Sequence, residues 1–336
     1  MLGFKRLALS RFLTPEPMKP FQLSIYLKTG LLALGLVTAG ALPVAHATDG
    51  IYYQFGLDLG YAGRIGYSGG TTPHWAIYTY GGGTSSAPFT ALDISAPSLV
   101  SGFQVDGNIA LAGAYSRLSV SGYGSTSGDR YEHTTSTEVV ADHGVIGGSR
   151  FSSTSINSLL SGGVTSLQNV SVQAAALTKT AGSPTNLDIG SGTNQVFSNT
   201  AFGGKYVMQL SNFVLGGRST LTLNGAAGSA FVLNISGNFN IGGASQILLT
   251  GGLTPSDVLF NVTGNNAGQT GALAFEIGGD SVFNGTLLAY NSAAKGVQRS
   301  LRISGHNTSV TGELIANQVV VSSGAKVKHP KKKSEE

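Results

Sequence analysis

Short runs of alternating apolar and polar residues, separated by glycine, make up most of the chain after residue 96. Between residues 96 and 148, segments such as 108–112 and 117–121 alternate with a period near two, which is typical of half-buried strands. From residue 196 to residue 327 the pattern strengthens. Segments such as 230–235 and 258–262 are mostly four to six residues long, and Gly, Asn or Ser stands in nearly every gap.

The shortness of these segments distinguishes between two architectures. A β-sandwich requires long hairpins, whereas a β-solenoid stacks short strands in parallel, one on each side of every coil. Solenoid corners are sharp and favour glycine, which adopts positive φ at little cost. We therefore predict a mainly β chain that folds as an irregular parallel β-solenoid, or β-helix.

One segment, residues 156–180, has a helical period instead. Val164, Leu167 and Val170 recur at three- and four-residue steps, and three consecutive alanines, 174–176, favour helix. The Gly-Ser-Pro run at 182–184 ends the pattern. We expect one helix, packed alongside the solenoid.

Several motifs occur in the order found in the bacterial choice-of-anchor A domain family, which the chain resembles over residues 96–327. The resemblance rests on DVLFN at 257–261, FNGTLLA at 283–289, SVTGELIAN at 309–317, VDGNIALAG at 105–113 and GAAGSAFVLNISG at 225–237. It implies a secreted or surface-displayed bacterial protein with a β-rich body, and distant kinship with ice-binding β-solenoid proteins. Tyr290 and Asn291 depart from the family's pattern, and no C-terminal sorting anchor is recognised.

The N-terminus has the pattern of a cleavable signal peptide, residues 1–47. Lys19 and Lys28 precede an apolar run at 30–41, and small residues at Ala45 and Ala47 predict cleavage between Ala47 and Thr48. The run is shorter than the roughly 20 residues that a membrane anchor requires, so we expect no stable transmembrane anchor after cleavage. Residues 1–17 have no apolar core, which suggests a translation start at Met18.

The remaining organisation follows from composition. Residues 48–95 are rich in Tyr and Gly and are predicted to form an N-terminal cap region before the solenoid domain, 96–327. Residues 328–336 form a basic tail that we expect to be disordered. The net charge of +4 comes from the two ends, because residues 48–325 carry 10 basic and 13 acidic residues. A nucleic-acid partner is therefore not expected, since nucleic-acid surfaces need clustered Lys and Arg.

Few residues suggest catalytic chemistry. The chain has no cysteine and no HExxH motif. The pairs Glu132-His133 and Asp142-His143 are candidate metal ligands or acid–base pairs, although polar loops explain them more simply. Glu276, Asp280 and Glu313, with Lys295, Arg299 and Arg302, are candidates for a polysaccharide-cleaving cleft only if the fold brings them together. We predict no catalytic, metal-binding or cofactor-binding residue, and no cofactor.

The predicted function is therefore non-enzymatic. Our main interpretation is an exported structural or adhesive protein, secreted or at the cell surface, that binds an extracellular polysaccharide, a matrix or surface polymer, or a second copy of itself. The first alternative is an ice-binding protein, which requires a flat face rich in Thr, Ser and Ala. Thr134, Thr135 and Thr137, and Thr220 with Thr222, are candidates for such a face, although Thr also has high β propensity. The second alternative is a polysaccharide-active β-helix enzyme.

Overall fold

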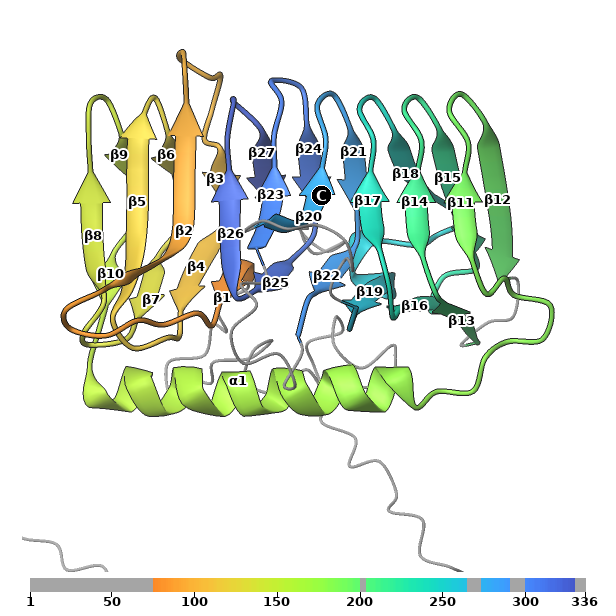
Figure 1. The fold of residues 1–336 in the computed structure, drawn as a ribbon, viewed down its shortest axis with the longest axis horizontal. Coiled ribbons are helices and arrows are strands. Elements are labelled where there is room, and N and C mark those ends of the chain that lie inside the picture. Colours follow the sequence, from red (N-terminus) through yellow and green to blue (C-terminus); the bar gives the residue numbers. More distant parts are fainter. Residues whose placement is uncertain (1–74, 200–203, 265–272, 291–299, 330–336) are drawn as a thin grey trace, which may run out of the picture. The chain divides into compact units, whose positions relative to one another are not determined.

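The computed structural model describes residues 75–199, 204–264, 273–290 and 300–329. These residues form three parallel sheets of nine strands each and one long helix, α1, Thr154–Ala175. Each coil of the chain contributes one strand to every sheet, so the predicted parallel β-solenoid is confirmed (Figure 1). The predicted helix is confirmed as well.

The three sheets are named A, B and C. Sheet A contains, in spatial order, β13 (Lys205–Leu210), β16 (Ala230–Ile235), β19 (Val258–Val262), β22 (Thr286–Leu288), β25 (Leu314–Ala316), β1 (Trp75–Thr79), β4 (Asn108–Leu111), β7 (Arg130–Glu132) and β10 (Arg150–Phe151). Sheet B contains β11 (Leu187–Ile189), β14 (Phe213–Leu215), β17 (Phe239–Ile241), β20 (Leu273–Ile277), β23 (Ser300–Ile303), β26 (Gln318–Val321), β2 (Phe89–Ala96), β5 (Ser116–Gly122) and β8 (Thr137–Val140). Sheet C contains β12 (Asn194–Asn199), β15 (Thr220–Gly225), β18 (Gln246–Thr250), β21 (Val282–Asn284), β24 (Ser309–Thr311), β27 (Lys326–Lys328), β3 (Val105–Asp106), β6 (Ser125–Thr126) and β9 (Val145–Ile146). A short 3-10 helix, η2 (Pro255–Asp257), precedes β19.

The described chain enters the solenoid in the middle of the stack. Strand β1 pairs with β4 on one side and with β25, from the far end of the sequence, on the other. Successive coils then build towards β8, β9 and β10, after which α1 carries the chain back along the stack to β11 (Figure 1). Residues 75–96, most of which belong to the predicted cap region, thus contribute β1 and β2 to the centre of the solenoid.

The length of α1 matches the length of the stack. A helix of 22 residues is about 33 Å long at 1.5 Å per residue. Nine parallel strands span eight intervals, or about 38 Å at the usual strand separation. One helix can therefore return the chain from one end of the solenoid almost to the other.

The helix begins and ends at side chains that satisfy its terminal backbone groups. Ser153 caps the N-terminus by accepting a hydrogen bond from the backbone N–H of Ile156 at 3.2 Å. Near the C-terminus, Gln209 donates to the carbonyl oxygens of Ala175 and Leu177 at 3.1 and 2.9 Å. These bonds explain why the helix ends before the predicted residue 180, because the sheet supplies donors in place of another helical turn.

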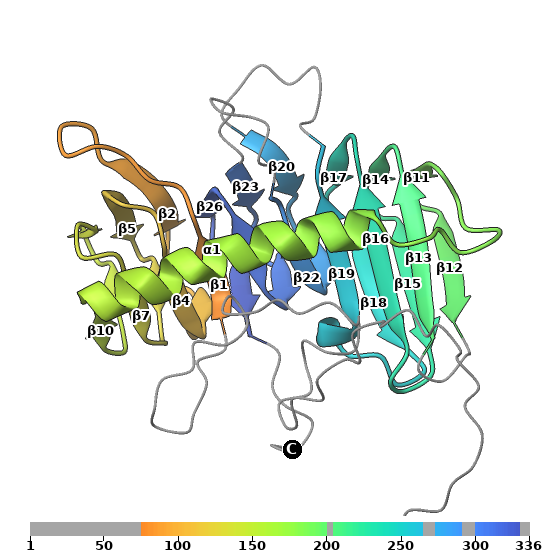
Figure 2. The same cartoon turned by 90° about the horizontal axis from the view of Figure 1, so that it is seen from below.

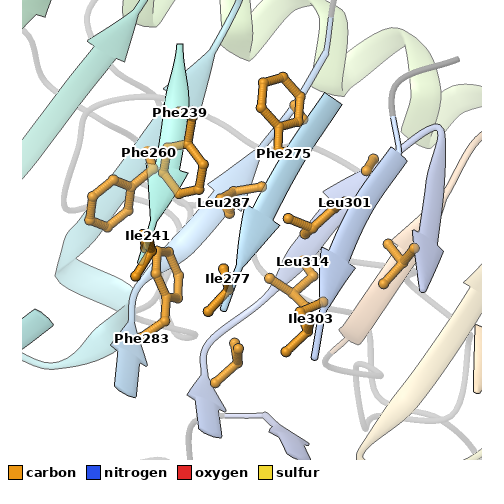
Figure 3. Packing of buried hydrophobic residues seen from close by; sticks show 14 of the residues in the cluster. Phe239, Ile241, Phe260, Phe275, Ile277, Phe283, Leu287, Leu301, Ile303 and Leu314 are labelled. Carbon is orange, nitrogen blue, oxygen red and sulfur yellow. The ribbon is translucent and has the colours of Figure 1, made fainter. Parts of the chain in front are cut away.

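Two apolar clusters hold the layers together. The first fills the interior of the solenoid, where Phe213 stacks on Phe239 with ring centroids 5.3 Å apart and planes at 12°. Phe260 and Phe283 form a tilted pair with centroids 4.9 Å apart, and both lie near Phe239 (Figure 3). The second lies between α1 and sheet A and contains Trp75, the only tryptophan. Sheet A is consequently buried on both faces from β16 to β1.

Candidate functional site

Sheets B and C present the two open faces of the solenoid. Strands β16 and β19 of sheet A are buried along their whole length, because α1 covers them (Figure 2). Strand β15 of sheet C instead alternates, with Leu221 and Leu223 buried and Thr220 and Thr222 half-buried. Every second residue of a strand therefore points outward. The outward residues of neighbouring strands line up in rows that run along the stack of coils.

Half of sheet C carries a face without ionisable groups, which we call the neutral face. It comprises the outward side chains of β12, β15, β18, β21 and β24. These residues are Asn194, Val196, Ser198, Thr220, Thr222, Asn224, Gln246, Leu248, Thr250, Val282, Asn284, Ser309 and Thr311. Hydroxyl, amide and methyl groups therefore alternate on a surface built from parallel strands.

The rows of the neutral face follow the strand register. Thr220 pairs with Asn194 and Gln246, which in turn pairs with Val282, and Val282 pairs with Ser309. A second row contains Val196, Thr222 and Leu248, and a third contains Ser198, Asn224 and Thr250. Neighbouring rows lie about 6.6 Å apart across the sheet, and residues within a row lie about 4.8 Å apart along the stack.

Hydrogen bonds fix several of these side chains. The Thr250 hydroxyl donates to the Asn224 side-chain oxygen at 3.1 Å. The Asn284 side-chain nitrogen donates to the Ile247 carbonyl oxygen at 2.7 Å. Such bonds reduce the conformational freedom that would be lost when a flat surface docks on the face.

The neutral face ends where β27, from the C-terminal part of the chain, pairs with β3. Lys326 pairs with Ser309, and Lys328 pairs with Thr311 on one side and with Asp106 on the other. Charged side chains on β27 and β3 thus bound the neutral face in the middle of sheet C.

Sheet B has a different outer surface, because ionisable groups interrupt its central row. In register order this row contains Asp188, Val214, Asn240, Glu276, Arg302, Val320, Asp93, Ser119 and Val139. From β11 to β23, Asp188 stands at one end of the row and Glu276 and Arg302 stand at the other. The remaining strands of the row contribute Asp93. The two open faces therefore differ in chemistry although they belong to the same coils.

The residues proposed for a polysaccharide cleft do not all lie on one face. Glu276 and Arg302 are register neighbours on the outer surface of sheet B. Asp280 accepts a hydrogen bond from the Asn307 side chain at 2.9 Å in a neighbouring turn, whereas Glu313 is buried between β24 and β25. Lys295 and Arg299 lie outside the described residues, as do Ala47 and Thr48 at the predicted cleavage site.

The two acid–histidine pairs have separate local contacts. Glu132 is fully buried and bonds to Arg150, whereas the His133 ring lies 2.8 Å from the Thr135 hydroxyl. The His143 ring stacks on Tyr123 at 4.7 Å. Within the described ranges, no group of three or more His, Cys, Asp or Glu side chains is placed to hold a metal ion.

Of the threonines singled out from the sequence, Thr220 and Thr222 lie on the neutral face. Thr134 lies elsewhere, where its hydroxyl accepts a hydrogen bond from the Asn157 side chain at 2.8 Å. The other members of the neutral face are not apparent from sequence, because their alignment depends on which strands stack. Among the described helices, none combines the length and hydrophobicity needed to cross a membrane.

A three-sided parallel β-solenoid with a helix along one side defines a known class of protein fold. The chain belongs to the Ice-binding-like family, whose model matches residues 95–327. A crystal structure of a glycosylated ice-binding protein, LeIBP, from an Arctic yeast is similar with a TM-score of 0.51 and 18% identity, over 83% of this chain and 96% of that one. A second LeIBP structure gives 0.50 and 16%, over 82% and 95%, and the ice-binding protein domain of Shewanella frigidimarina gives 0.49 and 16%, over 82% and 98%. None of the curated proteins matches the chain.

These comparisons correct the main functional interpretation from sequence. The family that matches is the Ice-binding-like family, not choice-of-anchor A. The motifs that suggested the latter are strands and turns of the solenoid, for example DVLFN at β19 and SVTGELIAN at β24 and β25, so they report the fold. The prediction of an adhesive protein that binds polysaccharide or a matrix polymer was wrong, and the ice-binding alternative is better supported.

Proposed function

We propose that this protein binds ice, and that the neutral face of sheet C is the surface that contacts the crystal. The proposal is supported by family membership together with one observation, the uncharged, regularly stacked outer surface of β12, β15, β18, β21 and β24.

The chemistry of the neutral face suits a crystal of water. Ice is electrically neutral and periodic, so a binding surface must hold many weak contacts in register at once. Threonine and serine hydroxyls and the Asn and Gln amides can hydrogen-bond to water, while the methyl groups of Thr222 and Val282 exclude it. Charged groups bind their own hydration water strongly, so the row of sheet B with Glu276 and Arg302 is the less suitable surface.

A matched pair of variants on one coil tests the proposal. Thr222 faces outward from β15 on sheet C, and Val214 faces outward from β14 on sheet B. Thr222→Tyr inserts a bulky ring between Val196 and Leu248 and lifts the surface away from a flat partner. A loss of only about 1.4 kcal/mol of contact free energy already weakens binding tenfold.

Thermal hysteresis, the gap between the melting and freezing temperatures of a crystal in the protein solution, is the readout. The unchanged protein is expected to produce hysteresis, Thr222→Tyr to lose most of it and Val214→Tyr to retain it, with circular dichroism confirming that both variants fold. The reverse order would refute the assignment to sheet C. An unchanged protein without hysteresis or crystal shaping would refute ice binding itself.

We further propose that the chain is exported through the signal peptide at 1–47 and acts without catalysis. The first proposal is supported by the charged, apolar and small-residue pattern that ends at Ala47. The second is supported by the burial of Glu313 away from the exposed Glu276.

A further inference from the structure

The coil at one end of the solenoid contains charged side chains where other coils contain core residues. Arg130 pairs in register with Ile109, Glu132 with Leu111, and Glu138 with Leu118. All three partners are fully buried members of the interior cluster. Because residues that pair in a parallel sheet point to the same side, these three charged residues point inward, and Arg150, which pairs with Arg130, does so as well.

The four residues form a connected network, which we call the charged plug. Arg130 lies 2.7 Å from Glu138, and Arg150 lies 2.9 Å from Glu132. Arg150 also donates to the Ser136 carbonyl oxygen at 2.9 Å, and Arg130 donates to the Gly147 carbonyl oxygen. The side chains of Arg130 and Glu132 are 8% and 0% exposed, whereas those of Arg150 and Glu138 are 42% and 23% exposed and form the outer layer.

The strands around the charged plug are the outermost in all three sheets. Among the strands that the structure describes, β8, β9 and β10 each have a neighbour on one side only. Strands β8 and β9 also carry exposed apolar side chains: Val139, Val140 and Val145 are 43%, 51% and 50% exposed. Such an edge, with unpaired backbone N–H and C=O groups, is a template on which another chain can add strands.

At the opposite end of the solenoid, the inward positions of the described strands β11, β12 and β13 carry no charged residue, although Gln195 on β12 is polar. The inward residues of β11 and β13 include Leu187, Ile189, Met208 and Leu210, all at most 5% exposed. The charged residues are therefore not a general feature of solenoid ends in this protein.

We propose that the charged plug terminates the solenoid and prevents a second copy of the chain from stacking on β8, β9 and β10. A coil added on this end would cover Arg150 and Glu138 and remove them from water. Removing such ions from water is strongly unfavourable unless new partners are provided. Inward-pointing charges are one of the means by which natural sheets protect their edges.

A variant that continues the apolar core through the last coil tests this role. Arg130→Ile, Glu132→Leu and Glu138→Leu introduce the residues of their register partners in the neighbouring coil, and Arg150→Leu adds an apolar residue beside position 130. In sedimentation velocity over a concentration series, we expect the unchanged protein to remain a monomer and the variant to form concentration-dependent oligomers. Adding Val140→Lys, which returns one charge to an inward position next to Val120, is expected to restore the monomer.

If the fourfold variant does not fold, Glu138→Leu with Arg150→Leu gives the same readout, because it removes the two exposed charges of the outer layer. Arg130 keeps its bond to the Gly147 carbonyl oxygen and lies 4.0 Å from Glu132. Circular dichroism decides which variant is used. A folded variant that stays monomeric at every concentration, or an unchanged protein that already stacks end to end, would overturn the proposal. Association that Val140→Lys does not reverse would also overturn it, because the growth would then occur elsewhere.

Discussion

Replacing Asn261 with alanine tests how the solenoid holds its helix. Asn261 is fully buried on β19 and faces α1. Its side-chain nitrogen donates to the Ser171 carbonyl oxygen at 2.9 Å and to the Asn234 side-chain oxygen at 2.8 Å, while its oxygen accepts from the Ser171 hydroxyl at 2.8 Å. Asn234 in turn donates to the Ala174 carbonyl oxygen at 2.7 Å.

The expected cost follows from the groups that lose partners. Asn261→Ala removes all three bonds and leaves the Asn234 oxygen and the Ser171 backbone carbonyl without these donors in a buried interface. Each unsatisfied buried group costs about 1–3 kcal/mol. The Ser171 carbonyl lies inside α1 and keeps its helical hydrogen bond, so the Asn234 oxygen is the one group left unsatisfied. We therefore expect the free energy of unfolding to fall by about 2–4 kcal/mol from this group and some lost packing.

Urea unfolding followed by circular dichroism measures this change, and the fluorescence of Trp75, which lies in the cluster under α1, reports on the helix interface. Asn240→Ala is the matched control, because Asn240 is exposed on β17 and its replacement should change stability by less than about 0.5 kcal/mol. If Asn261→Ala lowers the free energy of unfolding by less than about 1 kcal/mol, the hydrogen bonds from Asn234 and Asn261 to α1 do not hold the helix on the sheet.

Two further predictions concern the core and the charged plug. Phe239→Ala removes a fully buried ring that contacts Phe213, Phe260, Phe275 and Phe283, and should lower the free energy of unfolding by about 3–5 kcal/mol in the same urea assay; a change within 1 kcal/mol would contradict the packing. Burial and the neighbouring Glu138 raise the pKa of Glu132 from 4.5 to about 7. The folded protein therefore binds a proton that the unfolded chain releases, and this contribution to stability is lost as the pH rises from 4.5 through about 7. Glu132→Gln, which cannot ionise, should flatten the pH dependence of urea unfolding over this range; an unchanged slope would contradict it. Burial acts to raise the pKa of Glu138, but hydrogen bonds from Glu132 and Arg130 outweigh it and lower that pKa, so the Glu138 contribution lies below this range and has the opposite sign.

The strands and the helix could be predicted from sequence because each depends on local periodicity. Segments such as Ala230–Ile235 are short and bounded by glycine or serine, and the apolar steps at Leu167 and Val170 are helical. The entry of the chain at the centre of the stack could not be predicted, because the pairing of β1 with β25 joins residues more than 200 positions apart. No local pattern records such a pairing.

The candidate site and the charged plug could not be predicted either, because both depend on which strands pair. Thr222 and Leu248 become neighbours only once β15 and β18 stack, so a row on the neutral face is a property of register. Glu132 was interpreted as part of a polar loop, because a catalytic or metal-binding role needs groups that converge in a pocket and sequence does not show such convergence. It points inward because it pairs in register with the buried Leu111 of β4, and periodicity alone does not reveal that pairing.

Partition of the protein between ice and water tests ice binding most directly. When a dilute solution of the folded protein is frozen slowly on a cold surface, ordinary solutes are excluded from the growing crystal. If the neutral face binds ice, the protein concentration in the frozen fraction will exceed that of a co-dissolved control protein. Equal exclusion of both proteins would contradict the proposed function.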